Sequence, residues 1–163
     1  MTSVAFSPDG KLLISGSSDK SIKVMNFKTR QEIHCFKDAQ IGRFYSNNLF
    51  SITLHLDEIF SVHVRFDNKL VVSGSVDRCI KIFDLLAKKE VYHFKQVHED
   101  SITQVLWSPD GRFIFSASTD RSIKIFEFES KQEIHHFQFI HNGTFISKLH
   151  LIRKDSITCI AIS

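Results

Sequence analysis

Serine, histidine and aspartate occur together twice along this chain, in the same order and at matching spacings. The two groups are His55, Ser73 and Asp77, and His98, Ser116 and Asp120. These are the residue types of a hydrolase triad, in which a histidine activates a serine hydroxyl and an aspartate orients the histidine. The pattern therefore raises nucleophilic catalysis as a first hypothesis.

Two features of the pattern favour a structural role instead. Catalysis needs one such constellation, whereas this chain repeats it. In both copies the serine lies four residues before the aspartate, on a segment with the pattern of a hairpin. Side chains at this spacing brace a turn, so we expect no enzymatic activity. A hydrolase whose activity depends on Ser116 is the competing hypothesis.

The similarity extends well beyond these residues. The stretch "SGSSDKSIKVMNF", which begins at Ser15, returns as "SGSVDRCIKIFDL" and again as "SASTDRSIKIFEF". Asp77 and Asp120 lie 43 residues apart, and the repeats around them align without a gap. Asp19 precedes Asp77 by 58 residues, because additional residues follow the first repeat. A regular repeat of this length indicates a stack of similar supersecondary units.

Each repeat has the pattern of four β-strands. Short runs rich in β-branched and aromatic residues alternate with turn signals such as Pro-Asp-Gly. In "SIKIF", alternation puts Ile123 and Ile125 on one face and Lys124 and Phe126 on the other, so both faces need cover. We therefore expect four-stranded antiparallel meanders that stack face to face, as in a β-propeller.

These residues resemble the WD-repeat family of G-protein β-subunit-like propellers, chiefly through "VAFSPDG" followed by "LLISGSSDKSIKV". In that family a His, a Ser or Thr, an Asp and a Trp form a hydrogen-bonded set in each blade. The resemblance implies this role for both groups named above, with Phe83 and Phe126 at the tryptophan position. In the first repeat it implies Ser15 and Asp19, with Met25 at the tryptophan position. No repeat keeps the tryptophan, so each loses an indole hydrogen bond worth ~1 kcal/mol.

The resemblance predicts an all-β fold: a partial WD-repeat propeller of three four-stranded antiparallel blades plus the first strand of a fourth. The expected segments of this single domain, 1–163, are blade one at about 2–37, an insertion at about 38–54, blade two at about 55–95, blade three at about 98–138, an insertion at about 139–152 and the start of blade four at about 153–163. Three blades and one strand cannot cover every apolar face. We therefore expect the isolated chain to aggregate, to self-associate or to need further blades.

A basic residue follows the turn aspartate in every repeat, and a propeller would arrange all three around one face. These residues are Lys20, Arg78 and Arg121. They are candidates for binding phosphate or an acidic peptide. The competing interpretation is a solvated charge beside each aspartate, because no aromatic stacking residues are interleaved with them.

The two insertions are the least repetitive parts of the chain, and they are expected on the same face as these basic residues. Aromatic residues in long loops can anchor a partner protein. The candidates are Phe44, Tyr45, Phe50 and Phe145. Two alternatives stay open: a mobile loop, or non-coding sequence translated from a faulty gene model.

Composition excludes several classes of protein. At 42% hydrophobic and 24% charged residues the chain is typical of globular proteins, and no apolar run approaches the ~18 residues that cross a bilayer. Cys35, Cys79 and Cys159 form no CxxC pair, so reduced thiols and an intracellular, cytoplasmic or nuclear location are expected. No cofactor or metal site is predicted.

We therefore expect a non-catalytic scaffold that presents inter-blade loops to partner proteins. The main alternative is an RNA-processing or chromatin-associated propeller that contacts phosphate through its basic residues. The net charge of +3 comes from 21 basic and 18 acidic residues scattered along the chain, and does not indicate a nucleic-acid partner.

Overall fold

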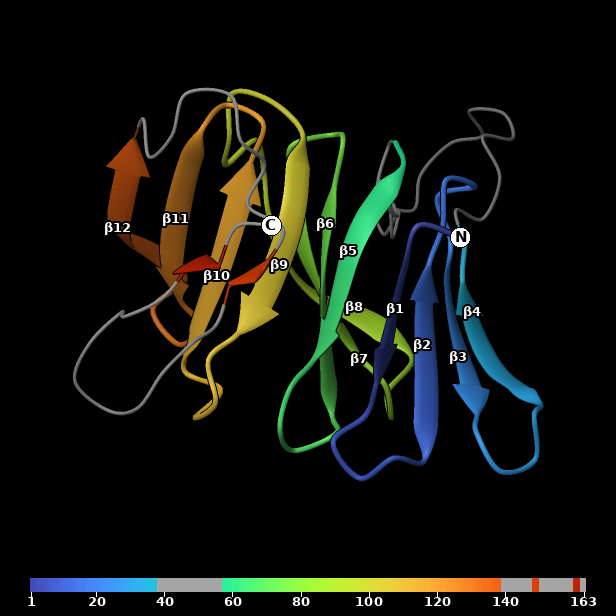
Figure 1. Ribbon diagram of the computed structural model, residues 1–163. Helices are drawn as coiled ribbons and strands as arrows, with labels where there is room; N and C mark the ends of the chain where they lie inside the picture. The colour runs from blue at the N-terminus through green and yellow to red at the C-terminus, as the bar shows by residue number, and fades with distance from the viewer. Residues whose placement is uncertain (38–56, 139–147, 150–159, 162–163) are drawn as a thin grey trace, which may run out of the picture.

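The computed structural model describes residues 1–37, 57–138, 148–149 and 160–161 of the chain. These residues contain no helix, and most of them form three four-stranded antiparallel sheets (Figure 1). The strands of the three sheets are β1 (Ser3–Phe6), β2 (Leu12–Gly16), β3 (Ile22–Asn26) and β4 (Glu32–Phe36); β5 (Ile59–Val64), β6 (Leu70–Ser75), β7 (Ile80–Asp84) and β8 (Lys89–Phe94); and β9 (Ile102–Trp107), β10 (Phe113–Ser118), β11 (Ser122–Glu127) and β12 (Gln132–Gln138). Each sheet is a meander, which confirms the predicted fold class.

Two further strands are short. β13 (Lys148–Leu149) and β14 (Ile160–Ala161) pair in antiparallel fashion with each other. β14 lies in the segment expected to begin a fourth blade, and β13 lies in the second expected insertion. The rest of that fourth-blade segment and of both insertions falls outside the described residues.

The turn between the second and third strands has the same backbone in all three blades. The residue after the turn aspartate has a positive φ in each case: 67° at Lys20, 66° at Arg78 and 66° at Arg121. Aspartate supports this turn because its carboxylate accepts the N–H two residues later, as Asp19 does from Ser21 at 3.0 Å. The repeated Asp-Lys/Arg dipeptide is thus a turn signal as well as a source of charge.

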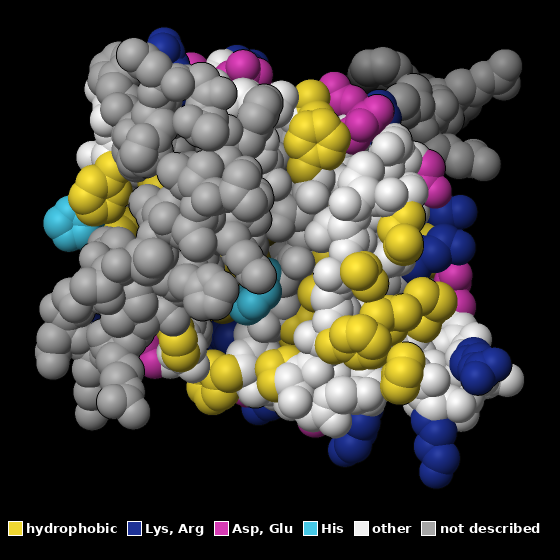
Figure 2. Space-filling view, viewed as in Figure 1, with side chains coloured by type: hydrophobic (Ala, Val, Ile, Leu, Met, Phe, Trp, Pro, Cys, Tyr) yellow, Lys and Arg dark blue, Asp and Glu magenta, His cyan; other side chains and the backbone are white. Residues whose placement is uncertain are grey.

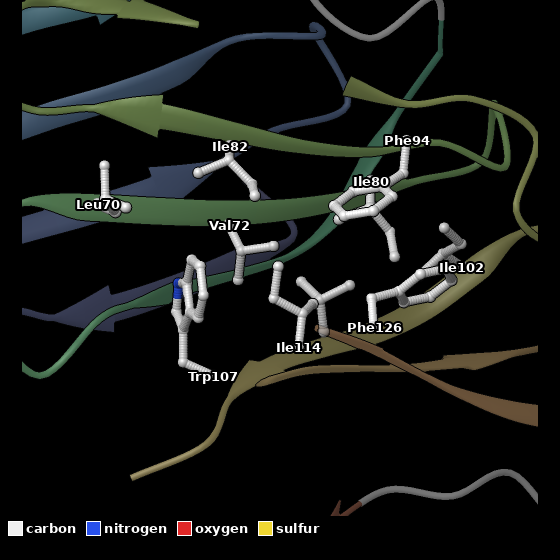
Figure 3. Close-up of a cluster of buried hydrophobic side chains, with 10 residues drawn as sticks. Leu70, Val72, Ile80, Ile82, Phe94, Ile102, Trp107, Ile114 and Phe126 are labelled. Atoms are coloured by element: carbon white, nitrogen blue, oxygen red, sulfur yellow. The ribbon is translucent and has the colours of Figure 1, made fainter. Parts of the chain in front are cut away.

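Large apolar side chains fill the two interfaces between neighbouring blades. One cluster joins blade one to blade two, and another joins blade two to blade three (Figure 3). The second cluster consists of Leu70, Val72, Ile80, Ile82 and Phe94 from blade two and Ile102, Val105, Trp107, Ile114 and Phe126 from blade three. Blade two is therefore covered on both faces, by blade one on one side and by blade three on the other.

Phenylalanine at the expected tryptophan position is an inter-blade contact. Phe83 and Phe126 are buried, and each ring packs on an aromatic ring from the last strand of the preceding blade. The ring centroids lie 4.9 Å apart for Phe36 and Phe83, and 4.9 Å apart for Phe94 and Phe126. Phe36 and Phe94, near the ends of the first two repeats, thus have a packing role.

Polar side chains also tie the first strands of the blades together. The hydroxyl of Ser3 accepts the N–H of Val62 at 3.2 Å, and the hydroxyl of Ser61 accepts the N–H of Val105 at 3.1 Å. These two serines occupy equivalent positions in consecutive repeats. β1, β5 and β9 are consequently neighbours, while β4, β8 and β12 lie at the far edges of their sheets.

Candidate functional site

In blade three, the histidine, serine and aspartate singled out in the sequence lie together. His98 precedes β9, Ser116 lies on β10 and Asp120 lies in the following turn. Nε2 of His98 is 2.7 Å from the hydroxyl oxygen of Ser116, and Nδ1 is 2.9 Å from Oδ2 of Asp120. The order of contacts is that of a hydrolase triad.

A fourth side chain completes the set. The Ser122 hydroxyl lies 2.6 Å from Oδ1 of Asp120 and 2.9 Å from Nδ1 of His98. The backbone N–H of Glu99 donates to Oδ2 of the same aspartate at 3.0 Å. Asp120 therefore joins its own turn to the segment that leads into β9.

The pKa shifts of His98 and Asp120 indicate which atoms of this set carry protons. Burial lowers the pKa of His98, an effect that the Asp120 carboxylate only partly offsets, so the ring is neutral at neutral pH. Burial acts to raise the pKa of Asp120, but hydrogen bonds from Ser122 and Glu99 and the nearby histidine lower it overall. The imidazole proton lies on Nδ1, which faces the carboxylate, and Nε2 accepts the hydroxyl proton of Ser116.

The burial of Ser116 and His98 limits the access of a substrate to these side chains. Only 1% of Ser116 and 4% of His98 are exposed. A cavity of about 160 Å³ opens beside the set, and its lining includes Asp120 and Ser122 but not Ser116. The nucleophile of a hydrolase has to reach a substrate carbonyl, so the arrangement supports a structural brace.

In blade two only part of the corresponding set is described. Ser73 is fully buried, and Oδ1 of Asp77 accepts the N–H of Cys79 at 3.0 Å. Burial raises the pKa of the Cys79 thiol, which suits a buried neutral side chain. His55 lies outside the described residues.

Blade one repeats the turn contacts. Oδ1 of Asp19 accepts the hydroxyl proton of Ser21 at 2.5 Å, and Ser15 is buried on β2. The part played by Ser21 and Ser122 was not predicted from the sequence. The available signal was the Asp-x-Ser spacing, which blades one and three share and which Cys79 interrupts in blade two.

The comparisons with known proteins agree with this geometry. Residues 1–26, 46–84 and 88–127, more than half of the chain, match the family model described as WD domain, G-beta repeat. The chain belongs to the WD-repeat family.

Relatives of this WD-repeat chain are considerably longer than it is. The WD repeat domain-containing protein 83 homolog of Dictyostelium discoideum is 32% identical over 65% of this chain and 41% of the relative. The WD repeat-containing protein 55 homolog of Drosophila persimilis is 30% identical over 63% of this chain and 17% of the relative. One of the chromatin assembly factor 1 subunits of Mus musculus is 28% identical over 64% of this chain and 19% of the relative.

Solved structures show the same fold. The crystal structure of RRP9 WD40 repeats superposes with a TM-score of 0.73 at 19% identity, covering 84% of this chain and 38% of that one. The structure of U3-55K gives a TM-score of 0.72 at 20% identity, covering 84% of this chain and 38% of that one. The WD-repeat chain thus spans less than half the length of the proteins it resembles.

The three predicted basic residues of the WD-repeat chain occupy equivalent turns, and we call them the basic rim: Lys20, Arg78 and Arg121. Arg78 and Arg121 are exposed, and Lys20 is half-exposed. The other predicted partner-binding residues, Phe44, Tyr45, Phe50 and Phe145, lie outside the described residues.

Neither a membrane-spanning helix nor a metal-binding cluster occurs in the described part of the WD-repeat chain. No helix in these residues is long and apolar enough to cross a bilayer. No three His, Cys, Asp or Glu side chains among the same residues stand close enough to hold a metal ion.

Proposed function

We propose that this WD-repeat chain is a non-catalytic scaffold that binds partner proteins on the face carrying the basic rim. The proposal rests on a turn that recurs in all three blades. In each blade this turn carries a cation with the same positive-φ backbone conformation. Side chains repeated in this way reach one partner surface together. Several shared contacts then raise affinity without any chemical step.

The rim turns are held in place before a partner arrives. The N–H of Arg121 donates to the carbonyl of Ser118 at 3.2 Å, and Asp120 fixes the other side of the same turn through Ser122. A turn that is ordered in advance loses little conformational entropy on binding. The hydrogen-bonded set of blade three therefore serves binding indirectly, because it positions the rim.

Ser116 is buried and cannot reach a substrate, which supports the proposal that the chain is not a catalyst. The matched relatives carry names of WD-repeat proteins and of a chromatin assembly factor component, and none of these names is that of an enzyme. Cys35 and Cys79 are free thiols, which supports an intracellular location.

Affinity capture from native cells, with bound proteins quantified by mass spectrometry, tests the scaffold proposal. The test variant combines Lys20→Ala, Arg78→Ala and Arg121→Ala. The matched control changes three exposed cations in turns at the opposite end of the sheets: Lys28, Arg30 and Lys88. Arg30 and Lys88 also have positive φ, 59° and 54°, so the control places alanine at two left-handed positions and the rim variant at three.

We expect the rim variant to lose proteins that the unmodified chain and the control both retain, with an unchanged melting temperature. Equal retention by both variants would contradict the proposal. So would equal loss, because it would indicate a response to net charge alone.

A second candidate function is contact with nucleic-acid phosphate in a chromatin-associated protein. The name of the mouse relative, a chromatin assembly factor component, favours it, as do the three cations of the rim. Binding of duplex DNA should then weaken with salt, with a log–log slope of about −0.9 per phosphate contacted. A slope near zero, or one that the rim variant leaves unchanged, would remove this candidate.

A further inference from the structure

The end of the blades opposite the basic rim has a hollow of about 320 Å³ between the loops that follow the first strands. We call it the apolar mouth. Its apolar lining includes Phe6, Val64 and Trp107 at equivalent strand ends and Pro8, Phe66 and Pro109 at equivalent loop positions. Three consecutive repeats thus supply the same two layers of apolar side chains to one site.

Each of the two layers of the mouth has a side chain that a partner can reach. Phe6 is 53% exposed and Phe66 is 55% exposed, which is unusual for phenylalanine. Figure 2 shows hydrophobic side chains gathered over β1 and beside it. Exposed apolar groups that cluster around a hollow are a common mark of a binding surface.

The layer at the strand ends also contains a hydrogen-bond donor without an acceptor. Trp107 is only 4% exposed, and among the described residues its indole Nε1 has no hydrogen-bond partner. In Figure 3 this nitrogen lies on the edge of the ring turned away from Val72 and Ile114. A buried N–H without an acceptor is unfavourable, so an oxygen supplied by a bound molecule would stabilise the site.

A second donor lies beside the first. His63 also lines the mouth, and its Nδ1 accepts the backbone N–H of Trp107 at 3.1 Å. Burial lowers the pKa of His63, so the ring is neutral and its proton lies on Nε2. The mouth therefore combines apolar walls with N–H donors, which suits a ligand that has both apolar groups and carbonyl oxygens.

Two cations in the loops around the mouth are paired within the protein. Lys11 lies 3.5 Å from Asp9, and the guanidinium of Arg65 lies 2.5 Å from Asp67. The three loops together carry four cations (Lys11, Arg65, Lys69 and Arg112) and three aspartates (Asp9, Asp67 and Asp110), so the edge of the mouth has little net charge and does not select a phosphate or a strongly acidic segment. Charge thus points to an uncharged occupant.

The loops that form the mouth brace one another. The N–H of Asp9 donates to the side-chain oxygen of Asn68 at 3.2 Å. Gly111, with φ of 69°, lies so close to Phe66 that a Cβ there would be 2.7 Å from the phenylalanine ring. Contacts between repeats thus hold the walls of the mouth in place before a ligand arrives.

We propose that the apolar mouth binds a short peptide segment of a partner protein, which inserts one large apolar side chain and gives a backbone carbonyl to the Trp107 indole. The volume is at the lower end of the ~300–1,000 Å³ range of pockets that enclose whole small ligands, and it suits a single anchoring side chain. This site is separate from the basic rim, so a scaffold could hold two partners on opposite faces.

Trp107 is the only tryptophan of the chain, so its indole N–H gives one resonance in a ¹H–¹⁵N spectrum. The probe is a set of 12-residue peptides selected from a random displayed library on the full chain and then synthesised without charged ends. We expect a consensus with one Phe, Leu, Ile or Trp and a downfield shift of the indole proton at saturation. Phe66→Ala should weaken binding at least tenfold.

Leu86→Ala is the matched control, because Leu86 is 78% exposed at the same end but does not line the mouth. Phe66→Leu, which keeps an apolar wall, should restore most of the affinity and so separates lost contact from lost folding. Failure to select any peptide, an unmoved indole resonance, or equal losses in Phe66→Ala and Leu86→Ala would each overturn the proposal. Selection of charged peptides whose binding disappears at high salt would do the same.

Discussion

Oδ2 of Asp120 lies 2.9 Å from Nδ1 of His98, and this contact links the turn after β10 to the segment that enters β9. The same oxygen accepts the N–H of Glu99, and the other carboxylate oxygen accepts both the N–H and the hydroxyl of Ser122. The Asp120 side chain thus accepts hydrogen bonds from four donors, and it joins the turn between β10 and β11 to the segment before β9.

Asp120→Ala should lower the free energy of unfolding by ~1–3 kcal/mol, because it leaves buried donors without an acceptor. Urea denaturation followed by circular dichroism measures the change. Glu129→Ala, at an exposed position in the next turn, is the control and should have almost no effect. A loss in Asp120→Ala no larger than in the control would contradict the role assigned to the aspartate.

Stability should also depend on pH through His98. Because burial lowers its pKa from the usual 6.5, the unfolded chain takes up a proton before the folded chain does as the pH falls. The free energy of unfolding should therefore decrease below about pH 6.5, by at most ~1.4 kcal/mol per pH unit for this one group.

His98→Gln isolates this contribution. The variant keeps a polar side chain but cannot titrate, so its stability should fall less steeply from about pH 7 to about pH 5. Burial also lowers the pKa of His34 and His63, and both remain in the variant as a common background. Identical pH slopes for the two proteins would show that His98 is protonated equally in the folded and unfolded states.

Repetition explains why so much of the fold could be predicted. The 43-residue offset and the alternation in "SIKIF" together imply stacked four-stranded sheets, and both depend on local sequence. The position of His98 beside Ser116 and Asp120 followed from the family resemblance, because these residues are far apart in sequence.

Contacts between blades could not be predicted in the same way. The hydrogen bond from Val105 to Ser61 and the missing partner of the Trp107 indole depend on how closely two sheets approach. Strand periodicity shows which face a side chain occupies, but not its distance from the next sheet. The apolar mouth was therefore not visible in the sequence, although its three equivalent loops were.

The spacing between blades two and three should depend on Gly74. A Cβ at this position would lie 2.6 Å from Cγ2 of Ile102 and 2.7 Å from Cγ1 of Val105. Gly74→Ala should therefore destabilise the chain by ~1–3 kcal/mol through overpacking, despite the better strand propensity of alanine. Thermal unfolding measures the change.

Ala117 provides the matched comparison, since it occupies the equivalent position in blade three and already carries a Cβ. Ala117→Gly should cost only ~0.5–1 kcal/mol, from the greater backbone freedom of glycine in the unfolded chain. If Gly74→Ala were neutral or stabilising, the close approach of β6 to β9 would be wrong.

Phe126→Trp restores the residue that the WD-repeat family has at this position, and it should destabilise this chain. Phe126 is 3% exposed, and its ring packs on Phe94 with centroids 4.9 Å apart, so a larger indole has to displace its neighbours. The Ser116 hydroxyl donates to His98, so its oxygen can still accept the indole N–H, but one regained hydrogen bond of ~1 kcal/mol does not offset overpacking of ~1–3 kcal/mol. We expect a melting temperature several degrees lower, in line with a loss of ~1–3 kcal/mol.

Combining Phe126→Trp with Phe94→Leu should recover part of that loss, because the smaller side chain makes room for the indole. A single variant that melts above the unmodified chain would show that the interface between blades two and three retains space for tryptophan.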